Sequence, residues 1–271
     1  MRFSVRHTTS YHYSAPIRLG PHQLRLMPRA ECTFLLEVTP PPVSRREGRD
    51  SWGNRVIELE FAGDTQVFSI ETQFSLDTTV PHSLPSGLPP LPWPAEIIDP
   101  ALTPFLMAED PGPEVRRFAE GLAQGTGSAI AFLVALNETL YTRTDRHIRM
   151  EGNARSAAET LATGRGACRD LTELFIAAAR CQGIPARFVS GYQAHSESPD
   201  GRRHLHAWPE VHIPGYGWRG FDPTHGRPVT DGHVALAVAP SQAGTMPIEG
   251  SFWGGAVSST LDYDISIRAA E

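Results

Sequence analysis

The chain has 271 residues, 40% of them hydrophobic, which is enough for one large domain or two medium ones with a sizeable core. The net charge of -6 is mild and does not gather in runs, and this argues against a nucleic-acid partner. The sequence has no signal-peptide pattern, no apolar run of membrane-spanning length and no CxxC pair, so we expect a reduced, cytoplasmic protein that makes no membrane contact.

Residues 1–80 are predicted to form a β-rich N-terminal domain. Runs at 34–39, 55–61 and 66–72 are β-branched or alternate between apolar and polar residues, and a turn signal lies at 50–54. An antiparallel β-sandwich-like domain is the natural interpretation.

Residues 81–112 are predicted to be a proline-rich linker. Six of the fourteen residues from 81 to 94 are proline. Helix interiors and central strands do not tolerate proline at this density, so this stretch indicates a domain boundary.

Residues 113–235 carry helical patterns first and strand patterns afterwards. Helices are predicted at 113–122, 128–139, 156–164 and 168–181, with an extended run at 141–144. Strands are predicted at 184–192, 204–213 and 218–222. This order indicates an α+β core. Residues 236–271 are predicted to be a C-terminal extension with one or two strands: 232–238 and 262–268 are strand candidates, and the stretch between them is irregular.

Cys168 follows a glycine-bearing loop and begins a predicted helix. Leu171, Leu174, Phe175 and Ala178 recur at helical spacing, so one face of this helix can be held in a core. Unpaired N–H groups and the helix dipole at an N-terminus favour a thiolate. A nucleophilic cysteine is one interpretation, and a structural cysteine is the other.

A predicted strand and the strand after it carry a base and a carboxylate. On the first strand, one face is shared by His204, His206, Trp208, Glu210 and His212. Asp222 ends the next strand. A four-residue loop at 214–217 would place Asp222 opposite Pro209, facing away from His206. We therefore predict a shifted register, through a turn at Pro214 or a bulge at Pro209, that places Asp222 opposite His206.

Three sequence blocks resemble the signature blocks of the bacterial transglutaminase-like superfamily, which has a papain-like cysteine-acyltransferase fold. They are Gly-Ala-Cys168-Arg-Asp, His206-Ala-Trp-Pro-Glu-Val and Gly-Trp-Arg-Gly-Phe-Asp222-Pro-Thr. Residues 7–13 and 22–29 resemble the β-rich domain that precedes this core in one bacterial subgroup. The resemblance implies a transglutaminase-like core at 113–235, with helices packed on an antiparallel sheet.

The resemblance also implies roles for individual residues. Cys168 is the expected nucleophile, and its backbone N–H contributes to an oxyanion hole. His206 is the expected general base and acid, and Asp222 orients it. Tyr141 is a candidate for the second oxyanion donor, and Trp208 is a candidate substrate-side residue that shields the imidazole.

The implied reaction is acyl transfer from a peptide or glutamine amide, through a thioester on Cys168. Water as acceptor gives a peptidase or deamidase, and a primary amine gives a transglutaminase. The expected partner is a peptide or protein substrate. No cofactor is expected, because no acidic calcium-loop pattern is present. The oligomeric state stays open.

Two other interpretations remain open. A zinc site could be built from His204, His206 and His212 with Cys168 or Asp222. A non-catalytic peptide-binding module is the second alternative.

Overall fold

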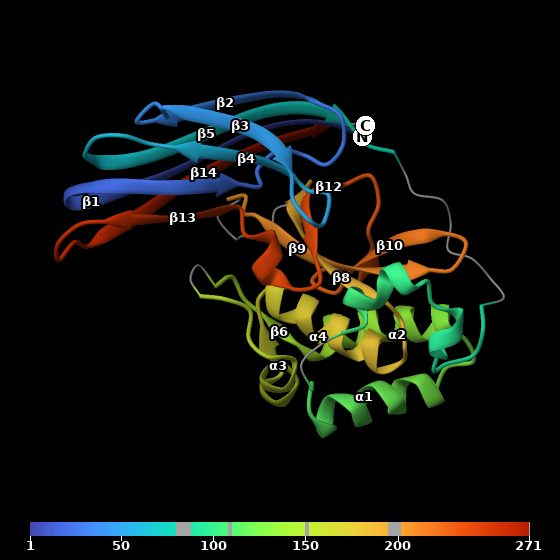
Figure 1. The fold of residues 1–271 in the computed structure, drawn as a ribbon. Coiled ribbons are helices and arrows are strands. Elements are labelled where there is room, and N and C mark those ends of the chain that lie inside the picture. The colour runs from blue at the N-terminus through green and yellow to red at the C-terminus, as the bar shows by residue number, and fades with distance from the viewer. Residues whose placement is uncertain (80–87, 108–109, 150–151, 195–201, 271) are drawn as a thin grey trace.

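The computed structural model shows three stacked layers (Figure 1). A seven-stranded antiparallel sheet lies on one side, a five-stranded sheet lies in the middle, and four α-helices cover the other face of the middle sheet. The structure describes residues 1–79, 88–107, 110–149, 152–194 and 202–270. The predicted α+β class, with an antiparallel β-rich N-terminal part ahead of a papain-like core, is confirmed.

The seven-stranded sheet is organised around its longest strand, β1. Its N-terminal strands are β1 (Arg2–Leu24), β2 (Thr33–Thr39), β3 (Ser44–Arg49), β4 (Arg55–Glu60) and β5 (Thr65–Asp77), in the order β2-β5-β1-β4-β3. Residues 2–12 and Ile17 of β1 pair with β5, and its last three residues, 22–24, pair with β4. The predicted runs correspond to β2, β4 and β5, whereas β1 and β3 were not predicted as strands.

The last two strands of the chain return to this sheet. They are β13 (Ile248–Trp253) and β14 (Ser259–Ala270), and both pair with β1. The ladder between β1 and β14 runs from Arg2–Ala270 to Tyr13–Ser259, so the two ends of the chain lie side by side (Figure 1). The predicted strand at 262–268 lies inside β14. The stretch expected to be irregular contains β13, which is a correction to that prediction.

The middle sheet has the order β11-β10-β9-β8-β12. Its strands are β8 (Ala186–Gln193), β9 (His206–Ile213), β10 (Gly217–Asp222), β11 (Arg227–Pro228) and β12 (His233–Ala239). Both faces of this sheet are covered. One hydrophobic cluster joins Phe188, Val211 and Phe221 to the helices. A second cluster joins Tyr192 and Leu236 to the N-terminal sheet.

The four helices begin at the predicted caps. They are α1 (Pro113–Gln124), α2 (Ala129–Arg143), α3 (Ala157–Thr163) and α4 (Cys168–Cys181). Ser128 and Ser156 are N-cap residues whose hydroxyls accept bonds from backbone N–H groups. The extended run predicted at 141–144 is wrong for its first three residues, because α2 continues to Arg143. Leu140 is buried in this last part of the helix, and this packing extends it.

The described part of the predicted linker lies against the core. The stretch 80–87 falls outside the described residues, and two short 3₁₀ helices follow at Ala95–Ile97 and Pro100–Phe105. Trp93 is buried, and its backbone N–H donates to Gln182 O at 2.9 Å. This contact fastens the proline-rich segment to the end of α4.

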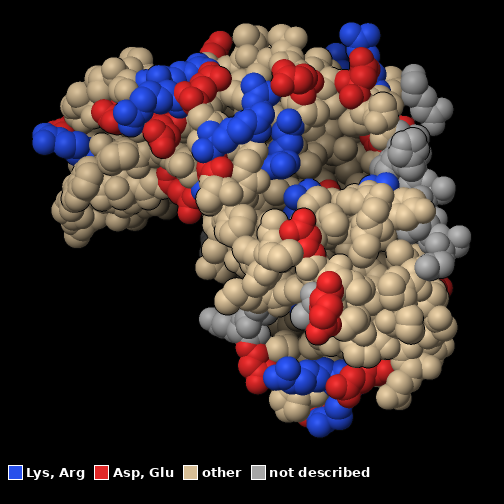
Figure 2. Space-filling view, turned by 45° about the vertical axis from the view of Figure 1, so that its right-hand side comes forward, with Lys and Arg blue, Asp and Glu red and all other residues tan. Residues whose placement is uncertain are grey.

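Charged side chains of both signs lie next to each other on the face drawn in Figure 2. On β3 and β4, Arg46 pairs with Glu58 and Glu60. On α1, Arg117 pairs with Glu114. Among the described residues, no helix is long and apolar enough to cross a membrane.

Candidate active site

The N-terminus of α4 is held in place by a buried carboxylate. Cys168 is the first residue of the helix, and Asp170, two positions later, is fully buried. One Asp170 oxygen accepts the Ala167 N–H at 2.8 Å. The other accepts Arg149 Nη2 at 2.6 Å and the Arg155 N–H at 2.8 Å. Asp170 therefore fixes the loop and the helix start that present Cys168.

Gly166 has a specific role in this loop. A Cβ at this position would lie 2.9 Å from Leu171 Cδ1 and 3.0 Å from Asp170 Cβ. Because both atoms belong to packed side chains of α4, a larger residue would push the helix start away from the loop. Glycine is thus required for the close approach.

His206 and Asp222 lie on the same face of the middle sheet, but not in the predicted register. Ile213 pairs with Gly217, so the loop between β9 and β10 has three residues, and pairing is recorded as far as Glu210–Gly220. The same register carried two residues further places Asp222 opposite Trp208, not opposite His206. Since side chains alternate along a strand, a three-residue loop still puts Asp222 on the His206 face. The prediction of direct opposition is wrong, and the prediction of a shared face is confirmed.

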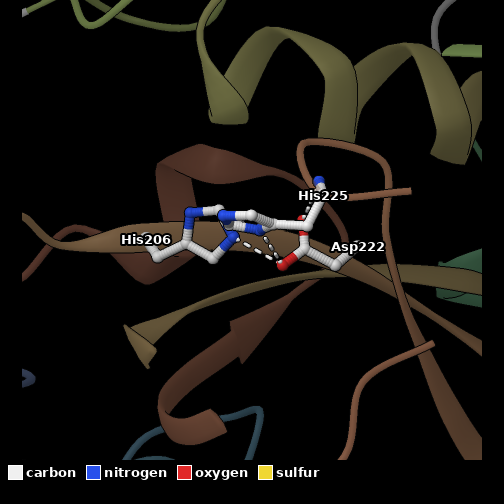
Figure 3. A group of neighbouring side chains, drawn as sticks. All are labelled: His206, Asp222 and His225. Carbon is white, nitrogen blue, oxygen red and sulfur yellow. Dashed lines mark hydrogen bonds and ion pairs between the residues drawn. The ribbon is translucent and has the colours of Figure 1, made fainter. Parts of the chain in front are cut away.

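Asp222 accepts hydrogen bonds from three histidines through one carboxylate oxygen. Figure 3 draws two of them, His206 and His225. His206 Nε2 lies 3.0 Å from Oδ2, His225 Nδ1 lies at 2.8 Å and His233 Nε2 lies at 3.0 Å. The other oxygen, Oδ1, accepts the backbone N–H groups of Thr224 at 3.0 Å and His225 at 3.2 Å. The carboxylate is fully buried, so these contacts replace water completely.

Burial and charge oppose each other in the pair formed by His206 and Asp222. Burial disfavours the His206 imidazolium, but the charge of Asp222 and hydrogen bonds to Asp222 and Cys168 raise the pKa of His206 well above its usual range. Burial also disfavours the Asp222 carboxylate, but the charge of His206 and the bonds from His206, His225 and His233 lower the pKa of Asp222 well below its usual range. The pair is therefore an imidazolium beside a carboxylate.

Cys168 and His206 line a cavity of about 330 Å³ between the core and the N-terminal sheet. Its wall on the sheet side includes Tyr11 from β1 and Tyr263 from β14. The Tyr263 hydroxyl lies 2.6 Å from His204 Nδ1, so the last strand of the chain contacts the segment that leads into β9. The cavity thus takes its walls from both ends of the chain as well as from the core.

Tyr141 and Trp208 do not line this cavity. The Tyr141 ring lies against Gly226, where an added Cβ would come within 2.6 Å of the ring, and the Arg146 guanidinium stacks over it. Trp208 is buried and packs with Val189, and its ring stacks on His206 with centroids 6.0 Å apart. Trp208 therefore packs on the His206 imidazole from outside the cavity.

The three histidines proposed for a zinc site do not come together. His204 bonds to Tyr263, and His212 lies edge-on against Trp218. Among the described residues, the group whose ligand atoms all lie within 4.8 Å of one another is His206, Asp222 and His225. The His204, His206 and His212 site is therefore a wrong prediction, because His212 lies near the far end of β9.

Sequence reasoning missed three histidines near the site. His225 and His233 reach Asp222 from a turn and from β12, and no spacing along the chain predicts that convergence. His147 lines the cavity, and its Nδ1 is buried without a hydrogen bond to any described residue.

Two family models match the chain. Residues 116–223 match the transglutaminase-like superfamily, and residues 3–77 match the bacterial transglutaminase-like N-terminal region. The uncharacterized protein Rv2569c of Mycobacterium tuberculosis is 27% identical over 98% of this chain and 92% of its own length. The uncharacterized protein ML0607 of Mycobacterium leprae is 24% identical over 98% of both chains.

A solved structure has the same fold. It is that of a candidate cysteine protease from Cytophaga hutchinsonii, with a TM-score of 0.74 and 22% identity, over 100% of this chain and 92% of that one. The predicted resemblance is confirmed in both of its parts, the N-terminal domain and the core. Residues 116–223 carry the transglutaminase-like core, and residues 3–77 carry the bacterial transglutaminase-like N-terminal region.

Proposed function

We propose that this protein is a thiol-dependent acyl-transfer enzyme that acts on peptide or glutamine amides through Cys168, His206 and Asp222. The observation that carries the proposal is the buried His206–Asp222 pair, whose imidazole also hydrogen-bonds Cys168 at the start of α4. This order of thiol, imidazole and carboxylate is what nucleophilic cysteine catalysis requires.

The electrostatics support a resting ion pair. In the proposed reactive state Asp222 is ionised and His206 is protonated, and the sulfur that attacks is the thiolate, because the thiolate is the nucleophilic form of cysteine. His206 Nε2 bonds to Asp222, so Nδ1 is the nitrogen on the thiol side. The thiolate attacks the amide carbonyl carbon, and the Cys168 N–H, unpaired within the helix, stabilises the oxyanion.

His206 then moves protons in two further steps, one that ends acylation and one that begins deacylation. His206 protonates the leaving amine, which departs as the C–N bond breaks and the thioester forms. Neutral His206 then takes a proton from the acceptor, and the acceptor oxygen or nitrogen displaces the sulfur. Water gives a carboxylic acid, and a primary amine gives a new amide.

A peptide library tests the proposal and identifies the acceptor. The wild-type protein is incubated with peptides in ¹⁸O-water, with and without a fluorescent primary amine, and the products are read by mass spectrometry. We expect either ¹⁸O-labelled acids or amine adducts, lost in Cys168→Ala and reduced by a factor of about 10² or more in His206→Ala. Turnover that survives Cys168→Ala would contradict the mechanism.

The same peptide library distinguishes a non-catalytic binding module from an enzyme. If peptides bind to the wild-type protein and to Cys168→Ala equally, and neither protein yields a product, the protein is a non-catalytic peptide-binding module. Trapping an acyl group on Cys168, seen as a mass increase on the peptide that contains it, would support catalysis directly.

A further inference from the structure

Asp222 receives more hydrogen-bond donors than its oxygens have lone-pair sites. Three imidazole nitrogens approach Oδ2 and two backbone N–H groups approach Oδ1. A carboxylate offers about four lone-pair sites in all, about two on each oxygen. A cation on Oδ2 removes this excess, because nitrogen lone pairs then face the metal in place of N–H groups.

The donor atoms also have the spacing of a metal site. Asp222 Oδ2 lies 3.0 Å from His206 Nε2 and 2.8 Å from His225 Nδ1, and the three atoms lie within 4.8 Å of one another. Zinc bonds of about 2.0–2.1 Å at tetrahedral angles separate neighbouring ligand atoms by about 3.3 Å. Small outward movements of the two imidazoles would therefore admit the ion.

We propose that Asp222, His206 and His225 form an inhibitory site for a divalent cation of the zinc type. Two imidazoles and one carboxylate with an open fourth position are a common donor set for zinc. His233 keeps its bond to Oδ2 and orients the carboxylate from outside the ligand set. His225 has 15% of its side chain exposed, so the ion enters from its side.

Metal binding at this site inhibits the enzyme because the ion occupies His206 Nε2, the nitrogen that bonds Asp222. The metal takes the lone pair of His206 Nε2, and the proton of that nitrogen is released to solvent. The imidazole is then neutral, with its remaining proton on Nδ1 facing Cys168. Such an imidazole has no free nitrogen for a further proton, and giving its Nδ1 proton to the leaving amine would leave an imidazolate on the metal, so the proton shuttle stops. This consequence rests on the proposed function, whereas the metal site itself does not.

Zinc binding to a thiol-free protein tests the site without any activity assay. Tag-free Cys168→Ala is titrated with Zn²⁺ by calorimetry, together with the double variants Cys168→Ala/His225→Asn and Cys168→Ala/His212→Asn. We expect one Zn²⁺ per chain in Cys168→Ala, more than about 10-fold weaker binding after His225→Asn, and unchanged binding after His212→Asn. His212 is a matched control on β9 that lies against Trp218, away from the cluster.

Cobalt provides a second readout. Co²⁺ in the wild-type protein should give visible absorption of a low-coordinate site without a thiolate-to-cobalt charge-transfer band. Binding that disappears in Cys168→Ala, or equal loss in the His225 and His212 variants, would overturn the proposal. If metal-free preparations show no acyl-transfer activity, that result would count against the proposed function. The zinc titration would still decide whether the metal site exists.

Discussion

The two sheets differ in where along the chain their strands come from. The middle sheet is built from strands between Ala186 and Ala239: β8 to β11 each lie beside the strand next in sequence, and β12 crosses over to pair with β8. The outer sheet takes β1 to β5 from the start of the chain and β13 and β14 from its end. The middle sheet carries His206 and Asp222, whereas the outer sheet supplies a wall of the cavity. Strands from one stretch of the chain thus hold the candidate reacting groups, and pairing between the two ends of the chain completes the cavity.

Removing the last two strands would break this arrangement most severely. Deletion of residues 246–271 removes the whole β14 ladder, from Arg2–Ala270 to Tyr13–Ser259, and leaves β1 paired with β5 on one edge only. We expect a loss of several kcal/mol in the free energy of unfolding, or insoluble protein. Denaturant unfolding measures this loss in the free energy of unfolding. Deletion of residue 271 alone is the control, and an unchanged midpoint for the longer deletion would contradict the structural role of β14.

Substitutions that create a cavity on either side of the middle sheet should lower the free energy of unfolding by similar amounts. Phe175 packs against Phe221 under the helices, and Phe74 packs against Tyr192 between the sheets. Phe175→Ala and Phe74→Ala should each lower the free energy of unfolding by about 3–5 kcal/mol. Calorimetry should show one transition in both variants, because β8 contacts both clusters. A separate transition in Phe74→Ala would mean that the outer sheet unfolds on its own.

The contact between the sheets should also be sensitive to acid. His7 Nδ1 lies 2.8 Å from the Tyr192 hydroxyl, and burial lowers the pKa of His7 to about 4 from its ordinary value of 6.5. The unfolded chain therefore binds more protons between those values, and stability falls as the pH drops through this window. The loss amounts to about 3 kcal/mol by pH 4.

A substitution isolates this contribution. The difference in unfolding free energy between pH 7 and pH 4 should be smaller in His7→Gln than in the wild type. His12, an exposed histidine on the same strand, provides the control substitution His12→Gln. Equal pH dependence in the wild type and His7→Gln would show that His7 does not titrate as its burial implies.

The smallest expected effect lies at the start of α3, the short helix before the Cys168 loop. Ser156 Oγ accepts the Glu159 N–H at 3.1 Å, so Ser156→Ala should lower stability by about 1 kcal/mol. Ser128→Ala at the start of α2 removes an equivalent cap and should have a similar effect. Thermal unfolding compares them, and no change in either midpoint would show that the caps are dispensable.

The elements of the core could be predicted from the sequence because their signals are local. Pro113, Ser128 and Ser156 mark helix starts, and the stripe on α4 marks its buried face. The strand β1 could not be found in this way. Its inward positions include His7 and Thr9, and these polar residues weaken the alternation that identifies a half-buried strand.

Part of the site could be predicted, and part depends on long-range packing. Cys168, His206 and Asp222 belong to sequence blocks in a recognisable order. His225 and His233 reach Asp222 only because the turn after β10 and the pairing of β12 with β8 bring them there. The three-residue loop between β9 and β10 was likewise invisible, because Pro214 and Gly215 fit several turn lengths.

The central claim is that Cys168 is an activated thiol paired with His206. Iodoacetamide labelling near pH 7, followed by mass spectrometry of each cysteine peptide, measures it directly. Burial raises the pKa of Cys32 and Cys181, so the account predicts that Cys168 is alkylated at least about 10-fold faster than either, and that His206→Ala reduces this advantage. Equal alkylation rates at the three cysteines, or an advantage unchanged in His206→Ala, would contradict the account.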